Sequence, residues 1–373
     1  MSTFQAMLVF KDFIAFVTSL DTSMSSRIHR HIDGRWRPMA FTIIVAIAGS
    51  LIALLLRFPI PWMLGSLLFC ATAKLMGLPI QTLPSSIERW MRVALGVFLG
   101  PSVAASIQQA GSDLPFAMSA AIVVTTFTVM GGMPWFEWRT KLPRRSAFMS
   151  AFPGGLSMLL ALAGDVGNRA EVLLVHAVRV VIVVVSISLL ARVLGVPTVS
   201  DPLIESLRWS TDTSILLLAS LIVVCFFIAE KLRWAGGHVM IPMIIAALLT
   251  YFTDISIEPP ELVKTCALLV FGIVIGCEVA NGPRDRYVRL FSASAIFTVA
   301  SMALAAALAL AMTGYIDQGF MVLFLALAPG GIAEVSLVAF ALGLDAGMVA
   351  LVHSCRFFYI ITAGPICMKF FQK

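Results

Sequence analysis

Apolar runs of about 20 residues follow one another along most of the chain, and a helix of that length crosses the ~30 Å hydrocarbon core of a bilayer. Hydrophobic residues make up 60% of the sequence and charged residues 12%, against about 45–50% and about 25% in soluble domains. The pattern predicts an all-α polytopic membrane protein and argues against a soluble enzyme, a nucleic-acid module and a disordered chain. A β-barrel would instead show ~10-residue segments of alternating polarity.

The apolar spans are separated by short polar segments that carry most of the charge. The spans cover residues 39–56, 60–76, 92–110, 114–133, 146–163, 170–195, 212–229, 238–252, 261–280, 288–312, 319–343 and 346–371. Clusters of Lys and Arg between spans are typical of cytoplasmic helix ends, so the net charge of +6 requires no nucleic acid as partner. We interpret the basic segment 1–38 as a cytoplasmic N-terminal arm and expect the C-terminus, with Lys369 and Lys373, on the same side. The cysteines show no CxxC spacing, so no disulfide framework and no metal site are expected.

Four short motifs occur twice in the same order and at a nearly constant separation along the sequence. Ile60-Pro61 recurs as Ile241-Pro242, Gly96-x-x-x-Gly100 as Gly272-x-x-x-Gly276, Ala151-Phe-Pro153-Gly154-Gly155 as Leu327-Ala-Pro329-Gly330-Gly331, and His176-x-x-Arg179 as His353-x-x-Arg356. We interpret each Ile-Pro as the opening of a span and each Gly pair as a close-packing face. The motifs predict a duplication, with a first membrane repeat over 39–195, an inter-repeat loop over 196–211 and a second repeat over 212–373.

Loop charges indicate how the repeats are oriented. The loop after the fourth span of the first half, 134–145, is basic, whereas the equivalent loop of the second half carries only Asp317. Equivalent loops therefore lie on opposite sides, which predicts inverted repeats. Inversion needs an odd number of crossings, so we expect about five transmembrane helices per repeat plus a re-entrant helix broken at Pro-Gly-Gly. The alternative, in which each triplet only kinks a crossing helix, gives twelve crossings and a parallel repeat.

The two Pro-Gly-Gly triplets mark the candidate site. Non-helical backbone at membrane depth is tolerated inside the protein or beside a water-filled cavity, and matching broken helices indicate a midplane transport site. Freed N–H groups at such breaks favour an anion. The candidate substrate-binding residues are therefore Pro153, Gly154, Gly155, Pro329, Gly330 and Gly331. We expect both triplets to be non-helical and to approach each other near the bilayer centre.

Each His-x-x-Arg motif places two polar side chains on one helix face. If the last helix starts near Asp345, Arg356 lies about 16 Å along it, near mid-bilayer. A charge there costs roughly 2.5–3.5 kcal/mol and usually has a partner. His176, Arg179, His353 and Arg356 therefore join the candidate site, in contact with a solute, as caps of hairpin carbonyls, or both.

One carboxylate belongs to the same site. Glu334 follows the second triplet, whereas the equivalent position of the first repeat is Met158. Glu334 is a candidate proton carrier or the counter-ion of Arg356. Asp165 and Asp345 end the broken spans, and we expect them to cap the helices that follow.

The repeated Pro-Gly-Gly, the Gly/Asp turn and the His-x-x-Arg motif resemble the AbrB family of bacterial inner-membrane proteins, as does Ile60-Pro61-Trp62-Met63-Leu64-Gly65. The resemblance covers nearly the whole chain after residue 38. It implies a duplicated membrane domain in the inner membrane. Members are often labelled as regulators or as ammonia monooxygenases. The family pattern carries Glu after Pro-Gly-Gly, which the second repeat keeps as Glu334 and the first replaces with Met158.

The sequence thus predicts a multi-pass secondary transporter of a small, anionic solute, not an enzyme, that works in the bilayer without a cofactor. No GxxxxGK[ST] motif is present, which leaves proton or sodium coupling. The sequence is compatible with a homodimer. The alternatives are a membrane regulator of the AbrB type without transport and a metal-dependent monooxygenase. A copper or iron site needs several imidazoles or carboxylates within reach, and only His176, His353 and Glu334 lie at useful depth.

Overall fold

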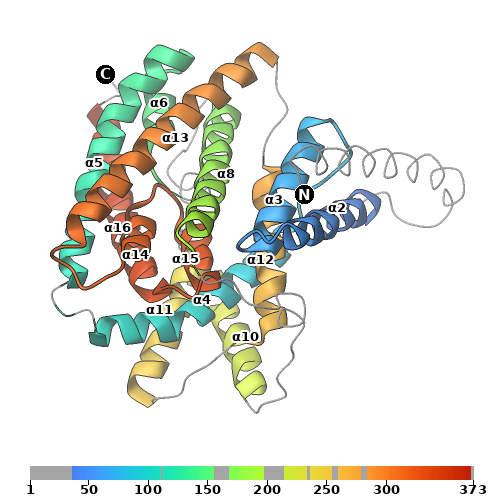
Figure 1. The fold of residues 1–373 in the computed structure, drawn as a ribbon, viewed down its shortest axis with the longest axis vertical. Helices are drawn as coiled ribbons and strands as arrows, with labels where there is room; N and C mark the ends of the chain where they lie inside the picture. Colours follow the sequence, from blue (N-terminus) through green and yellow to red (C-terminus); the bar gives the residue numbers. More distant parts are fainter. Residues whose placement is uncertain are drawn as a thin grey trace, which may run out of the picture.

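The computed structural model describes residues 36–109, 111, 113–154, 168–196, 214–232, 236–253, 259–278 and 284–370 (Figure 1). Within these ranges the chain is all-helical, with thirteen helices and no strand. The helices are α2 (Trp36–Leu55), α3 (Pro61–Leu75), α4 (Ser85–Gln109), α5 (Asp113–Thr140), α6 (Arg144–Ala151), α8 (Arg169–Val193), α10 (Ser214–Leu232), α11 (Gly237–Thr253), α12 (Glu261–Cys277), α13 (Arg284–Met312), α14 (Phe320–Leu327), α15 (Ile332–Ala341) and α16 (Ala346–Phe370). Most of the predicted arm, residues 1–35, and most of the inter-repeat loop lie outside the described residues.

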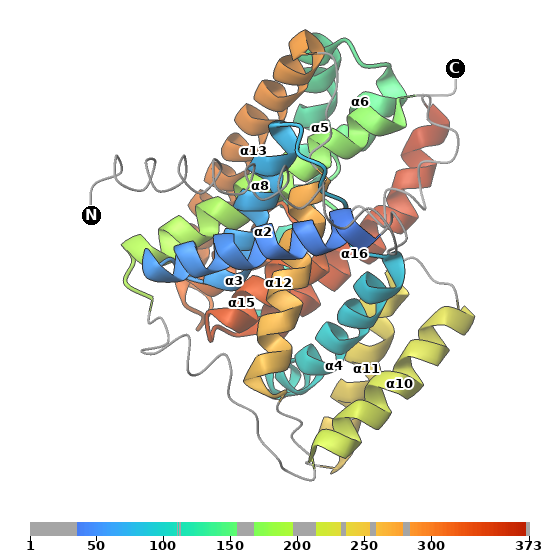
Figure 2. The same cartoon turned by 90° about the vertical axis from the view of Figure 1, so that its right-hand side faces the viewer.

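Six described helices are long and apolar enough to cross a membrane, namely α2, α4, α5, α8, α13 and α16. Large apolar side chains stand exposed on their outer faces, for example Phe127 and Met130 of α5 and Val299 of α13. Lipid tails can cover such surface, whereas soluble proteins rarely leave it contiguous. In Figures 1 and 2, α5, α8 and α13 lie together at one end of the molecule, and α4, α10 and α11 at the other.

The second Pro-Gly-Gly separates α14 from α15, and Pro329, Gly330 and Gly331 are non-helical. In the first half, α6 ends at Ala151, and Pro153 and Gly154 are non-helical. The residues before the two prolines, Phe152 and Ala328, both have extended backbone, because a proline disfavours the helical region for its predecessor. The prediction of non-helical triplets is therefore confirmed for five of the six residues; Gly155, like Met158 and Asp165, lies outside the described part.

The helix after the second broken span, α16, starts where predicted. The carboxylate of Asp345 accepts a hydrogen bond from the backbone N–H of Met348 at 2.9 Å, which is the geometry of an N-cap. The same oxygen accepts a bond of 2.6 Å from the Ser106 hydroxyl, so the cap also fastens α16 to α4. The predicted capping role of Asp345 is confirmed.

The Gly pairs lie where helices of the two halves cross. A Cβ at Gly96 of α4 would lie 2.3 Å from the carbonyl oxygen of Val239 in α11. A Cβ at Gly272 of α12 would lie 2.5 Å from the carbonyl oxygen of Met63 in α3. Only glycine permits such backbone approach. The close-packing interpretation is confirmed, and Met63 and Val239 are separated along the sequence by the same offset as the two glycines.

The Ile-Pro match needs correction. Pro61 begins α3, but Pro242 lies inside α11, so only one of the two dipeptides opens a helix. The ring of Pro242 packs against Gly96, and its counterpart against Gly272 is Ser66, at the equivalent position of the first half. The recurrence of Ile-Pro, whose separation differs from that of the other motifs, is therefore a chance similarity. The glycine motif gives the register of the contacts.

Gly96→Ala is expected to destabilise the protein by about 1–3 kcal/mol, because the new methyl group meets backbone that cannot rotate away. The matched control is Gly131→Ala in α5, where a Cβ would meet nothing within 4 Å. There the higher helix propensity of alanine should leave the free energy of unfolding equal or raised by up to about 1 kcal/mol. Thermal unfolding in detergent compares the two variants. Equal melting temperatures would contradict the close crossing of α4 and α11.

Candidate functional site

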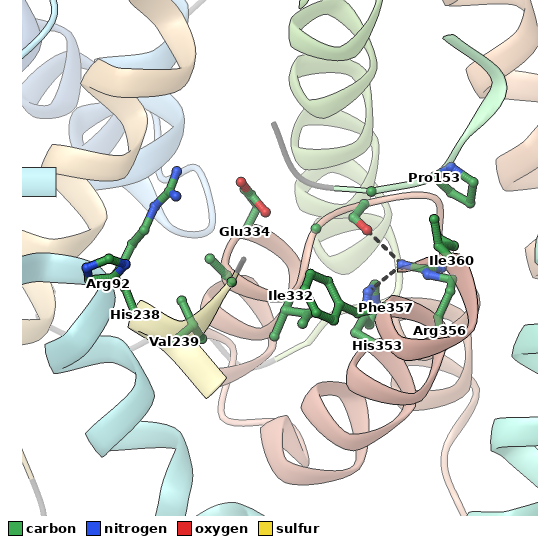
Figure 3. Close-up of a pocket in the computed structure, with 15 residues that line it drawn as sticks. Arg92, Pro153, His238, Val239, Ile332, Glu334, His353, Arg356, Phe357 and Ile360 are labelled. Atoms are coloured by element: carbon green, nitrogen blue, oxygen red, sulfur yellow. Dashed lines mark hydrogen bonds between the residues drawn. The ribbon is translucent and has the colours of Figure 1, made fainter. Parts of the chain in front are cut away.

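The second break is held by Arg356 of α16. Its guanidinium donates from Nη1 to the carbonyl oxygen of Ala328 at 2.8 Å and from Nη2 to that of Gly330 at 2.7 Å. Nη2 also donates to Nδ1 of His353 (Figure 3). Because a guanidinium only donates, Nδ1 accepts, so Nε2 of His353 carries the proton and donates to the carbonyl oxygen of Leu325 at 2.9 Å. Both side chains are buried, and together they satisfy carbonyls that the break removes from the helix ladder.

The first break has a similar brace. Arg179 of α8 donates to the carbonyl oxygens of Phe152 and Ser150. His176 places Nε2 3.1 Å from the carbonyl oxygen of Phe152 and Nδ1 2.8 Å from that of Val172 in its own helix. Of the roles open to these arginines, the structure shows the binding of backbone carbonyls at both breaks.

Residues from both breaks line one cavity. Its volume is about 70 Å³, several times the roughly 10–15 Å³ that one water requires. The cavity lies between α4, the start of α11, the start of α15, and α16 (Figure 3). Its lining consists of Arg92, Pro153, Gly154, Gly236, His238, Val239, Gly330, Gly331, Ile332, Ala333, Glu334, His353, Arg356, Phe357 and Ile360. The described residues of the two triplets therefore lie close to each other, as expected, whereas their position near the bilayer centre stays a prediction.

Arg92 of α4 is a candidate site residue that the hydropathy pattern did not indicate. The predicted span began at residue 92, which made Arg92 a boundary charge, whereas α4 begins two turns earlier, at Ser85. Arg92 forms an ion pair with Glu88 one turn before it, and its side chain is 18% exposed. Its Nε is buried without a hydrogen-bond partner among the described atoms. The sequence feature that could have indicated Arg92 is the group of charged residues at the start of this apolar span, Glu88, Arg89 and Arg92.

Glu334 lies in the first turn of α15 and is 8% exposed. The helix dipole stabilises a carboxylate at this position. Glu334 forms no ion pair with Arg356 or with any other residue in the described ranges, so the interpretation of Glu334 as the counter-ion of Arg356 is wrong for this structure. Figure 3 shows it on the side of the cavity toward Arg92, with Arg356 across from it.

The remaining candidates divide between cavity and scaffold. Pro153, Gly154, Gly330, Gly331, His353 and Arg356 line the cavity, whereas Pro329 and Arg179 do not. His176 lines a smaller neighbouring cavity together with Glu334. His238, which the sequence did not single out, lines the main cavity at the start of α11.

Metal-ligand chemistry is sparse at the site. Within the described ranges, no three His, Cys, Asp or Glu side chains gather closely enough to hold a metal ion. All six cysteines are free thiols.

Six apolar helices of membrane-spanning length and a cavity with charged residues in its wall are typical of an α-helical membrane protein. The chain matches the family described as "Transition state regulatory protein AbrB" over residues 62–372, and it therefore belongs to the AbrB family. It is 25% identical over 322 residues to the Escherichia coli (strain K12) protein named "Putative regulator AbrB", covering 85% of this chain and 91% of that protein. It is also 25% identical over 355 residues to "Uncharacterized protein YhjN" of Bacillus subtilis (strain 168), covering 87% of this chain and 90% of that one.

Proposed function

We propose that this protein is a secondary transporter, not an enzyme, that carries a small anionic solute across the bacterial inner membrane through the cavity between the two breaks. One observation carries the proposal. Two non-helical segments, one from each half of the sequence, line the same cavity, and each is braced by a buried arginine. Broken helices at matching positions of two repeats are the usual architecture of a midplane transport site.

We further propose that the two halves are inverted repeats, each with a re-entrant broken helix. The crossings of α4 with α11 and of α3 with α12 support a twofold relation between the halves, because they exchange equivalent partners. The opposite charge of equivalent loops supports inversion. Reporter fusions should place both termini in the cytoplasm; termini on opposite sides would exclude an inverted repeat with this number of crossings.

The charges of the cavity favour an anion. The guanidinium groups of Arg179 and Arg356 donate to backbone carbonyls. Arg92 is therefore the arginine of the cavity wall whose Nε–H has no hydrogen-bond partner among the described residues. The first-turn residues of α15, Ile332 and Ala333, line the same cavity, and N–H groups of a first turn have no partner within the helix. Glu334 lines the same cavity, so the solute binds beside a carboxylate of the protein.

The test uses purified protein and defined probes. Acetate, lactate, succinate, citrate, glutamate and inorganic phosphate are screened for a rise in melting temperature, with choline as a cationic control. Each radiolabelled anion is then offered to proteoliposomes. We expect at least one anion to stabilise the protein and to exchange across the membrane. Stabilisation without exchange would favour a regulator without transport, and the Escherichia coli relative is named "Putative regulator AbrB". Stabilisation by choline alone would overturn the anion assignment.

A further inference from the structure

A second, smaller cavity adjoins the first. Its volume is about 10 Å³, close to the space that one water needs. Arg92 and Glu334 line both cavities, so these two side chains form the wall between them. The smaller cavity also contacts Glu278, which follows the last turn of α12, and His176 of α8.

Two carboxylates therefore meet at one water-sized space. Glu334 is more than nine-tenths buried, and Glu278 is half-buried. Neither forms an ion pair within the described part of the chain, because Arg92 pairs with Glu88 instead. The unpartnered Nε of Arg92 at the same wall is an independent sign that the space holds a polar occupant.

The surrounding charges leave this pair short of positive partners. The titratable groups around the two cavities are Arg92 of α4 with its partner Glu88, His176 of α8, Cys277 of α12, His238 of α11, and His353 and Arg356 of α16. Arg179, one turn after His176, lines neither cavity. Of the arginines, Arg92 is paired with Glu88, and Arg179 and Arg356 are bound to carbonyls. Two carboxylates that share a site of low dielectric do not both ionise readily, and they titrate as a unit.

We propose that Glu278 and Glu334 hold one exchangeable proton between them and that this proton is the coupling ion. The coupling rests on the proposed transport function, whereas the shared proton does not. A hydronium ion from one side gives its proton to a carboxylate oxygen of the pair, and water on the other side takes it back, so no electron is transferred. An anion bound at Arg92 places negative charge beside Glu334 and favours the protonated pair. By linkage, the proton favours anion binding to the same extent, which makes the protein a symporter of anion and proton.

Infrared difference spectroscopy tests the proton without any solute. In protein reconstituted in liposomes, a pH titration should show the C=O stretch of a protonated carboxylic acid near neutral pH. That band should shift when the protein carries ¹³C-glutamate and should be lost in Glu278→Gln and in Glu334→Gln. The control is Glu137→Gln, at a pair with Arg144 on the surface, which should keep the band. A wild-type protein without the band overturns the inference, even if it transports, and the ¹³C shift decides the matter if a variant fails to fold.

Transport separates the two proposals. With the labelled anions named above, an inward proton gradient should drive accumulation at least tenfold more strongly in wild type than in Glu278→Gln or Glu334→Gln, while exchange at equal pH continues in all three. Accumulation driven by sodium and not by protons would overturn proton coupling. If the infrared band is present and no anion moves, the transport proposal fails and the shared proton stands.

Discussion

Arg356→Gln should lower the free energy of unfolding by about 2–6 kcal/mol, from about 1–3 kcal/mol for each of two buried carbonyls left without a donor. Those carbonyls belong to Ala328 and Gly330 and are bound by two different nitrogens of Arg356. Glutamine is shorter and has a single donor nitrogen, so it cannot replace both bonds from α16. His353 also loses the donor to its Nδ1. Thermal unfolding and anion exchange are measured on the same preparation, because a residue that only contacted the solute would change exchange without changing stability.

The control for this variant is Arg145→Gln, an exposed arginine in the short helix α6, which should change stability by less than about 0.5 kcal/mol. Arg356→Lys is a second comparison. It keeps the positive charge but loses the planar fork that donates to two carbonyls at once. If Arg356→Lys is as stable as wild type, the charge matters and the bidentate geometry does not. A stable Arg356→Gln protein with normal exchange would remove Arg356 from the site and from the brace.

Arg92→Gln should weaken the binding of the stabilising anion about 10- to 100-fold, because a hydrogen bond to a charged group contributes about 1.5–3 kcal/mol. The loss of folding stability should be small, about 0–1 kcal/mol, since the ion pair with Glu88 is on one helix and partly exposed. Affinity is read from the dependence of melting temperature on anion concentration. Arg92→Gln and Arg356→Gln are compared directly, because we expect Arg92 to bind the solute and Arg356 to stabilise the fold.

Arg89→Gln is the matched control for Arg92. Arg89 lies one turn earlier on α4 and pairs with Glu230 of α10 at 2.8 Å, away from the lining of the cavity. Its replacement removes the same charge from the same helix, so a general electrostatic effect would weaken anion binding in both variants. Unchanged binding in Arg92→Gln, or equal losses in the two variants, would exclude Arg92 as the anion-binding residue.

The breaks and the close crossings could be predicted from the sequence because their causes are local. A proline followed by two glycines interrupts a helix at any position. Two glycines four residues apart leave one face of a helix without side chains, so that another helix can pack closely against it. The charge partners could not be predicted in this way. Arg356 binds backbone carbonyls and not Glu334. A helix break leaves carbonyl groups without their helical partners, and a hydropathy profile does not show such acceptors.

Arg92 and Glu278 were missed for a related reason. Arg92 is the first residue of the predicted span 92–110, and Glu278 lies two residues before the end of the span 261–280. A charge so close to the end of a span is ordinarily taken to mark the boundary of the membrane. The structure places them beside the cavities, because α4 extends past its apolar part and α12 stops at Cys277. Only the packing of α4, α12 and α15 brings them together, and that depends on contacts between the two halves.

The exchange of partners between α3, α4, α11 and α12 also has a consequence during synthesis. Gly96 leaves the ribosome long before Val239, the residue whose backbone it packs against. At roughly 5–20 residues per second, synthesis from one to the other takes about 7–29 s, and during that delay the flat face of α4 has no partner. The first half therefore enters the bilayer incomplete and waits for the second, so a ribosome that stalls after the first half releases a membrane protein with its crossing faces uncovered.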